Sequence, residues 1–295
     1  MSVTIAQLRA LVTVVDRASF TVAATELGVS QSAISHSVTG LEKAVGGRVL
    51  RRDGGITLTA LGLGVIEHAR AALASVSALE SAVRRDETLS GTVRLGAVAT
   101  VCQGLVPDLL ALWSARLPNI AVSIYEGDDE EMPEWLEAGL VDAAVLVEPS
   151  PAPPGGLLVA TDEFAALVPA DHPLAQQDSI PLDELDDDGL IVSTGGCETH
   201  VRKMHDELGL PYVFSHRVRE MSTMFRMVQQ GMGVAVIPSL GRGMLPEDLV
   251  MRPLTARRPR QLVLSGPTTR PWHPLVGALV DATGVDFAST VKVEL

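Results

Sequence analysis

Apolar residues recur at helical spacing through the first 45 residues of the chain. They lie three or four positions apart in residues 4–17, which predicts a helix with one buried face. A second helix follows from residue 20, and Gly28 can take the left-handed conformation that ends it. Ser30 can cap a third helix that continues to about Val45. The inward-facing positions are Ile5, Leu8, Leu11, Val12 and Val15 in the first helix, Ala23, Ala24 and Leu27 in the second, and Ile34, Val38 and Leu41 in the third.

The third helix has a polar outward face that suits a DNA major groove. After it, the segment RVLRRDGGITLT contains two short β-like runs about Asp53-Gly54-Gly55, which predicts a hairpin. The combination is a winged helix–turn–helix, whose hairpin can reach phosphates while the helix meets base edges. The alternative is a small helical packing module. The predicted DNA contacts are Gln31, Ser32, Ser35, His36 and Thr39 on the helix, and Arg51 and Arg52 on the hairpin.

A long helical pattern extends from Thr59, a plausible N-cap, to about Thr88. Its apolar positions are spaced alternately by four and three residues, as in a heptad repeat. A helix of about 28 residues would be about 40 Å long, more than one small domain can cover. Pairing with a second copy would bury this seam; packing on its own second domain is the alternative. The heptad seam consists of Val65, Ala69, Ala72, Val76, Leu79 and Val83.

The rest of the chain alternates between strand-like and helical segments. A strand at residues 93–98, a helix at 104–116 and a strand at 120–126 predict a βαβ unit with a ligand-prone turn at Thr100 to Gln103. A last helix is expected at Leu275 to Ala282. Further buried strands are predicted at VDAAVLV, EFAALVP, LIVST, YVFSHRV, GVAVIPS and QLVLSG. We therefore expect an α/β second domain.

Charge is distributed unevenly along the 295 residues, whose formal net charge is -13. The first 60 residues hold six basic and four acidic side chains, so the excess of acid lies entirely in the remainder. A polyanion such as DNA would be repelled by most of the molecule and tolerated only near its N-terminal end. The acidic runs EGDDEEM and LDELDDDG are interpreted as solvated surface rather than as metal sites.

Other classes of protein fit the sequence poorly. Hydrophobic residues make up 46% of the chain, but no charge-free run of about 18 apolar residues occurs, and the first residues lack a basic signal segment. We therefore expect a cytoplasmic protein without a membrane partner. No Gly-x-Ser-x-Gly elbow, Walker loop or His-Glu-x-x-His motif is present, so no enzymatic activity, cofactor or metal is expected. Two cysteines are too few for a disulfide framework.

Residues 4–88 resemble the DNA-binding domain and linker helix of the LysR-type transcriptional regulators. The resemblance rests on the segment SFTVAATELGVSQSAISHSVTGLEKAVGGRVLRRDGGITLTALG, and the remainder of the chain is similar to the family's effector-binding domain. The implied fold is α/β: an N-terminal winged helix–turn–helix (residues 1–58), a linker helix for dimerisation (59–90) and a two-lobed domain similar to periplasmic binding proteins (91–295). Ser32, His36 and Thr39 depart from the proline and basic residues usual in the family.

The resemblance also implies two crossing strands, which we place near Asp162 and Ser265. Lobe one would then comprise residues 91–161 and 266–295, and lobe two residues 162–265. The cleft between them would bind a small effector, and hydroxyls and free N–H groups at helix starts suit an anion. The effector contacts implied are Thr100, Val101, Cys102, Ser193, Thr194, Cys197, Ser222, Thr223 and Phe225.

The resemblance implies double-stranded DNA as the partner, bound by a homodimer or a homotetramer, with RNA polymerase as a further candidate. An alternative function is thiol-based redox sensing, because STGGCETH resembles the site of the reactive cysteine in peroxide-sensing members. A helix start at Cys197 would stabilise its thiolate, and only Cys102 is available to resolve the oxidised form. A third hypothesis is a ligand-binding protein with an inactive DNA module.

Overall fold

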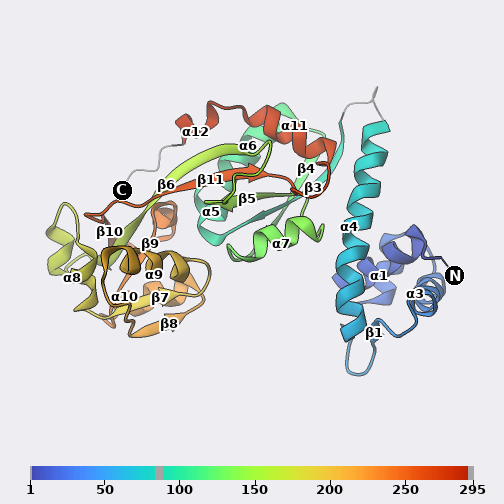
Figure 1. Ribbon diagram of the computed structural model, residues 1–295, viewed down its shortest axis with the longest axis horizontal. Coiled ribbons are helices and arrows are strands. Elements are labelled where there is room, and N and C mark those ends of the chain that lie inside the picture. The colour runs from blue at the N-terminus through green and yellow to red at the C-terminus, as the bar shows by residue number, and fades with distance from the viewer. Residues whose placement is uncertain (1, 84–88, 292–295) are drawn as a thin grey trace.

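The computed structural model describes residues 2–83 and 89–291 (Figure 1). Its N-terminal part is a winged helix–turn–helix. Thr4, Ser19 and Ser30 cap the three helices through their side-chain oxygens, and Gly28 joins the second and third helices at a φ of 66°. The elements are α1 (Ile5–Arg17), α2 (Phe20–Glu26), α3 (Gln31–Val45), and the hairpin strands β1 (Leu50–Arg51) and β2 (Thr57–Leu58).

The linker helix α4 (Ala60–Val83) begins directly after the hairpin. The Thr59 hydroxyl accepts a hydrogen bond from the backbone N–H of Gly62, which confirms Thr59 as the N-cap. A Cβ atom at Gly62 would lie 2.1 Å from the carbonyl oxygen of Val49, so only glycine permits this close approach of helix and wing. The helix therefore leaves the DNA-binding domain at a fixed angle.

The heptad seam on α4 is divided between two environments. Val65 packs on the core of the DNA-binding domain of its own chain and Ala69 is 1% exposed, whereas Leu79 is 65% exposed. Ala72 and Val76 are half-buried, and the side chain of Val83 lies outside the described part. Towards its C-terminal end the helix touches lobe one, where the Ser77 hydroxyl lies 3.2 Å from Nε2 of His273. Intrachain packing thus accounts for the first half of the seam.

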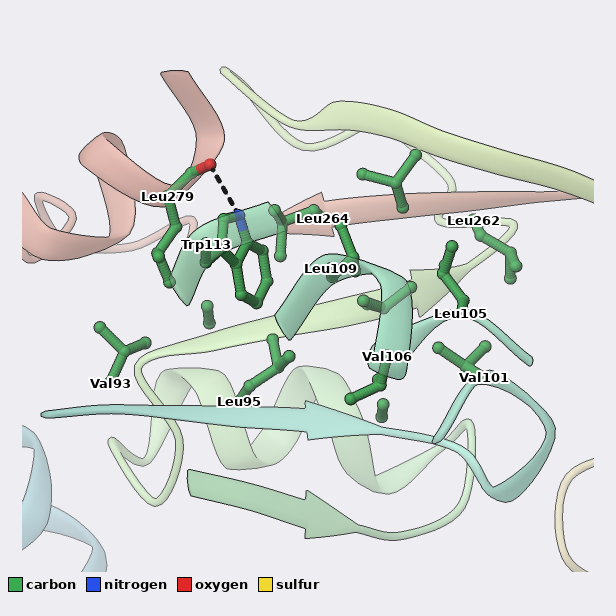
Figure 2. Packing of buried hydrophobic residues seen from close by; sticks show 14 of the residues in the cluster. Val93, Leu95, Val101, Leu105, Val106, Leu109, Trp113, Leu262, Leu264 and Leu279 are labelled. Atoms are coloured by element: carbon green, nitrogen blue, oxygen red, sulfur yellow. Dashed lines mark hydrogen bonds between the residues drawn. The ribbon is translucent and has the colours of Figure 1, made fainter. Parts of the chain in front are cut away.

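Lobe one is a sheet with helices on both faces (Figure 1). Its strands are β3 (Gly91–Ala97), β4 (Ile120–Glu126), β5 (Ala143–Val147) and β11 (Pro259–Ser265); β3 pairs in parallel with β4 and β5, and β11 is antiparallel to β5. Helices α6 (Val106–Arg116) and α11 (Pro274–Thr283) cover one face, and α7 (Glu131–Glu137) covers the other. Figure 2 shows the first core, where the Trp113 indole N–H donates to the carbonyl of Leu279 at 3.2 Å. Because its N–H keeps a hydrogen-bond partner, the indole can be buried between α6 and α11 without leaving a polar group unsatisfied.

The predicted helix at 104–116 is confirmed as α6 (Val106–Arg116). A short helix α5 (Ala99–Gly104) precedes α6, and the expected turn at Thr100 to Gln103 belongs to it. Pro107 can occupy only the first turn of a helix, because it has no N–H to donate to the turn before it. The interruption at Leu105 follows from this constraint.

Lobe two repeats the arrangement with shorter strands. These are β7 (Leu190–Ser193), β8 (His216–Val218), β9 (Val234–Pro238) and β10 (Leu249–Pro253). Two cores lie on opposite faces of its sheet, one under α8 (Leu182–Asp186) and α9 (Cys197–Leu208), the other under α10 (Met221–Gln229). The expected strand YVFSHRV is reduced to β8, and β10 was not predicted. The remaining elements are the 3₁₀ turns η1 (Pro173–Gln176) and η2 (Ser239–Met244), and α12 (Phe287–Thr290).

The long strand β6 (Leu157–Pro169) joins the lobes. Residues 157–163 pair with β11 in lobe one, and residues 164–169 pair with β9 and β10 in lobe two. The outgoing crossing therefore lies at Asp162 to Phe164, close to the expected position. The return crossing near Ser265 is wrong: Ser265 pairs with Ala144 inside lobe one, so the chain returns at about Arg258. The register places the whole of β11 in lobe one, which extends that lobe at the expense of lobe two.

Candidate functional site

The outward face of α3 carries the predicted base-contacting residues. Gln31, Ser32, His36 and Thr39 are exposed and Ser35 is half-buried, so the helix offers this face to a groove. Two of the hydroxyls already have local partners: Ser32 lies 2.9 Å from the Ser30 cap, and Thr39 donates to the carbonyl of Ser35 at 2.8 Å. Gln31 and His36 therefore have the side chains best able to take a base edge.

The hairpin beside α3 carries exposed positive charge. Arg51 and Arg52 are both exposed, and the Arg52 guanidinium stacks over the ring of Phe20 at 4.6 Å. The stack holds Arg52 in one orientation while leaving its N–H groups available. Lys43 and Arg48 are also exposed, just before the hairpin in the chain, and neither was among the predicted DNA contacts. Both are among the six basic residues of the N-terminal 60 positions, and this clustering of positive charge could have identified them as candidate DNA contacts.

Two pockets open between the lobes at the carboxyl ends of β4 and β7. The Asp129 pocket has a volume of about 450 Å³, and the Ser193 pocket about 290 Å³. Asp128 lines both, and it follows β4 on the edge that faces lobe two. The Asp129 pocket is lined by Asp128, Asp129, Glu130, Glu131, Thr194, Gly196, Glu198, Thr199, His200, Arg202 and Arg217; the Ser193 pocket by Ala99, Gln103, Glu126, Gly127, Asp128, Ser193, Gly195, Arg219, Glu220, Met221, Ser222 and Met244.

Acidic groups dominate the walls of both pockets. The three arginines that line them are each paired already: Arg202 and Arg217 with Glu198, and Arg219 with Asp128. Burial raises the pKa of Glu198, but the hydrogen bonds from its two arginines outweigh burial, so its pKa is lowered overall. The pKa of Asp128 is raised, first by desolvation and then by its acidic neighbours, against the attraction of Arg219. The cleft therefore has a negative potential.

The run EGDDEEM, interpreted from the sequence as solvated surface, forms part of this wall. Asp128 and Asp129 are half-buried, which corrects that interpretation for these two residues. Within the described residues, no group of three histidine, cysteine or carboxylate side chains is arranged to hold a metal ion. The run is part of the cleft because the turn after β4 directs it towards lobe two.

A buried ion pair lies at the hinge where the two crossing strands meet. Arg260 of β11 donates to both carboxylate oxygens of Asp162 on β6, at 2.7 and 2.8 Å, and both side chains are almost completely buried. Arg260 also donates to the Thr100 hydroxyl at 3.2 Å, and Asp162 accepts from the backbone N–H of Leu240 at 3.3 Å. This network joins α5 of lobe one to η2 of lobe two. Its burial makes it the most strongly coupled polar cluster of the hinge.

The structure distributes the predicted effector contacts unequally. Ser193 and Ser222 line the Ser193 pocket, and Thr194 lines the Asp129 pocket. Thr100 is 4% exposed and accepts a hydrogen bond from Arg260, so it belongs to the hinge network and lines neither pocket. The others leave the candidate set: Val101 and Cys102 pack on the lobe-one core, Cys197 and Phe225 on the cores of lobe two, and Thr223 is exposed outside both pockets.

The two cysteines have environments that oppose thiolate formation. Burial raises the pKa of Cys197 to about 12 despite the nearby positive charge of Arg260. Burial, assisted by Glu126, raises the pKa of Cys102 to about 12 as well. A helix does start at Cys197, as expected, but burial of the thiol opposes the thiolate that this helix start would favour. The cleft and hinge residues that were not predicted from the sequence are mainly charged. They include Asp129, His200, Arg219 and Arg260.

Comparison with known proteins covers both halves of the chain. Residues 5–63 match the model described as bacterial regulatory helix-turn-helix protein, lysR family, and residues 86–284 match the LysR substrate binding domain. The chain is 28% identical over 272 residues to the uncharacterized HTH-type transcriptional regulator YvbU of Bacillus subtilis, covering 90% of this chain and 93% of that protein. It is 33% identical over 183 residues to a probable hydrogen peroxide-inducible genes activator of Mycobacterium xenopi, covering 60% of this chain and 96% of that protein.

Two solved structures show the same fold along the whole chain. A variant of full-length OxyR from Pseudomonas aeruginosa superimposes with a TM-score of 0.76 at 24% identity, covering 99% of this chain and all of that one. CbnR in complex with its target DNA gives a TM-score of 0.64 at 20% identity, covering 95% and 98%. The fold and the site thus define a winged helix–turn–helix transcriptional regulator with a two-lobed substrate-binding domain. The chain belongs to the LysR family of transcriptional regulators. None of the helices in the described residues is long and apolar enough to cross a bilayer.

Proposed function

We propose that this LysR-type regulator binds duplex DNA through the exposed face of α3 and the arginines of the hairpin, and that a small molecule in the inter-lobe cleft alters this binding. The exposure of Gln31, His36, Arg51 and Arg52 supports the first part, and the two pockets between the lobes support the second. A ligand can act only by binding one arrangement of the lobes more tightly than another. RNA polymerase is a candidate partner of the DNA-bound form.

We further propose that the effector carries a positively charged group, in contrast to the anion expected from the sequence. The observation that carries this proposal is that Arg202, Arg217 and Arg219 are all neutralised by carboxylates. Glu126 and Glu220 add two exposed carboxylates to the Ser193 pocket. An anion would meet repulsion there, whereas an ammonium or guanidinium group would find acceptors.

Two sets of small molecules matched in length test the charge of the effector. Putrescine and agmatine represent cations, and succinate and glutarate represent anions. At equal ionic strength, we expect the cations to raise the melting temperature of the full chain and the anions to leave it unchanged. The double variant Glu126→Gln/Glu220→Gln should weaken the response to cations. Stabilisation by the carboxylates alone would contradict the proposed charge.

DNA binding is tested separately, by footprinting the purified protein on the DNA upstream of its own gene. Protection at a discrete site is expected, and the variant Gln31→Ala should lose the discrimination between this site and random DNA. Equal loss on both DNAs would contradict a base-contacting role for Gln31. A fully non-specific footprint by the wild type would favour the ligand-binding protein with an inactive DNA module.

We propose that the exposed end of the heptad seam pairs with a second copy, so that the regulator is a homodimer or homotetramer. The exposure of Leu79 supports pairing, because an apolar side chain of this size gains by burial. The thiol-sensing alternative receives no support from the pKa of about 12 at Cys102 and Cys197. Mass spectrometry after mild peroxide treatment tests it, and we expect neither cysteine to be oxidised.

A further inference from the structure

The imidazole of His200 bridges the two lobes on the wall of the Asp129 pocket. His200 belongs to α9 of lobe two, and its Nε2 lies 3.0 Å from Oδ2 of Asp129 in lobe one. Its Nδ1 lies 3.8 Å from Oε2 of Glu148, which follows β5 of the same lobe. The ring also packs on Phe164, with centroids 5.2 Å apart. Both nitrogens of one side chain therefore face carboxylates across the cleft.

The chemistry of the ring decides what these contacts require. A neutral imidazole has one N–H, so it can donate to only one carboxylate while the other nitrogen presents a lone pair. An ionised carboxylate accepts hydrogen bonds and donates none. Only the protonated ring satisfies Asp129 and Glu148 together. Histidine side chains in general change charge between about pH 5 and pH 8.

Two unusual backbone conformations flank the contacts of His200. Glu148 has a φ of 42°, a conformation that residues with a side chain adopt rarely. Gly196, at the start of α9, has a φ of 99°, and a Cβ there would lie 3.2 Å from the carboxylate carbon of Asp129. The lobes thus meet closely at this point.

The other charged groups around His200 are mostly engaged elsewhere. On the Asp129 pocket side these are Asp128, Glu130, Glu131, Glu198, Arg202 and Arg217, of which Asp128 pairs with Arg219, and Glu198 with Arg202 and Arg217. On the other side a cavity of about 250 Å³ is lined by Lys203, Glu207 and Arg258, and Glu207 pairs with Arg258. Lys203 is exposed and opposes the charge on His200, whereas Glu130 and Glu131 favour it. Asp129 and Glu148 are the two carboxylates in ion-pair contact with the ring.

We propose that His200 is a proton-dependent latch between the lobes: its protonated ring pairs with Asp129 and Glu148 and holds the cleft closed, and loss of the proton favours opening. Closing the latch takes up a proton, so a fall in pH shifts the population towards the closed form. The latch would add to the proposed function a control of lobe closure by pH that requires no effector. Failure of the latch would leave the effector and DNA proposals untouched.

Distances between two spin labels measure closure in the full-length protein without ligand. Asp108 on α6 and Asp183 on α8 are exposed and lie outside the cleft, so cysteines at these positions label one lobe each. Cys197 is buried and Cys102 is half-buried, and burial raises the pKa of both thiols to about 12, so the exposed introduced cysteines react in preference to them at neutral pH. Dilution with unlabelled protein removes distances between copies. From pH 8.0 to pH 5.5 we expect the ratio of short to long distances to rise about fivefold, the size expected for one partly exposed ion pair.

Three variants make the measurement specific to His200. His200→Gln keeps one N–H donor but has no charge to gain, and it should remove the pH response. Glu148→Gln leaves the contact with Asp129 and should roughly halve the response. His172→Gln is the matched control, because His172 pairs with Asp188 within lobe two, 3.5 Å away; it should respond like the wild type. Melting curves check that each variant is folded. A wild type without a pH response, or an undiminished response in His200→Gln, would overturn the latch.

Discussion

The hinge ion pair offers the sharpest test of how the lobes are held together. Arg260 and Asp162 are 2% and 0% exposed as side chains, so the variant Asp162→Asn leaves a guanidinium buried without its counter-charge. Breaking such a pair from one side costs about 3 to 5 kcal/mol, far more than the net worth of the intact pair. Burial lowers the pKa of Arg260, but Asp162 more than restores it, so the pKa is raised and the guanidinium stays charged throughout the physiological range.

Urea unfolding followed by tryptophan fluorescence measures this cost in lobe one. Trp113, Trp135 and Trp272 all belong to that lobe, so the signal reports the half of the hinge that holds Arg260. With a slope of about 2 to 3 kcal/mol per molar urea, the midpoint should fall by about 1 M or more. The double variant Asp162→Asn/Arg260→Met should lose less than the sum of the two single variants, because it leaves no unpaired charge. A midpoint within about 0.3 M of the wild type for Asp162→Asn would refute the reasoning.

Three further predictions concern the rest of the chain. Arg51→Ala/Arg52→Ala should weaken binding to every DNA sequence and flatten the dependence of affinity on salt by about one to two in slope, and an unchanged slope would exclude the hairpin from the interface. Leu79→Asp should lower the mass seen by light scattering, while Leu63→Asp, 58% exposed in the wild type but off the seam, should not. The lowered pKa of Glu198 adds stability above about pH 4.5 that is lost as the pH falls, so Glu198→Gln should flatten the acid limb of unfolding by on the order of 1 kcal/mol or less.

Sequence patterns correctly predicted the features that depend only on neighbouring residues, such as buried helix faces and helix caps. Spacing of Ile34, Val38 and Leu41 predicted one buried face of α3, and all three are buried in the structure. The N-cap at Thr59 could also be predicted from the sequence, because it depends on a single hydroxyl and the next three residues. The heptad seam shows that a local signal can be correct and incomplete. Spacing identifies the apolar stripe, but it does not show that Val65 already packs on the DNA-binding domain of its own chain.

Features that depend on pairing between strands distant in the sequence could not be predicted from local patterns. The return crossing was placed at Ser265 because QLVLSG ends there, whereas the register with β5 carries all of that strand inside lobe one. Strand β10 was missed because its segment, LVMRP, ends in proline and has no clear alternation. It is stable in the structure because β6 supplies its partners from Ala165 to Pro169. Pairing partners 80 or more residues away in the sequence decided both outcomes.

The acidic run after β4 shows the same limit for function. A window of sequence around Asp129 contains only acids and a tight turn, which is typical of solvated surface. Its partner, His200, lies 71 residues further along the chain, and no local pattern connects the two. The global excess of acid did carry information, since it confined DNA to the N-terminal domain. The same excess, concentrated at a cleft whose arginines are already paired, is the basis for proposing a cation rather than an anion as the effector. On that proposal, one charge asymmetry separates the two binding functions in space.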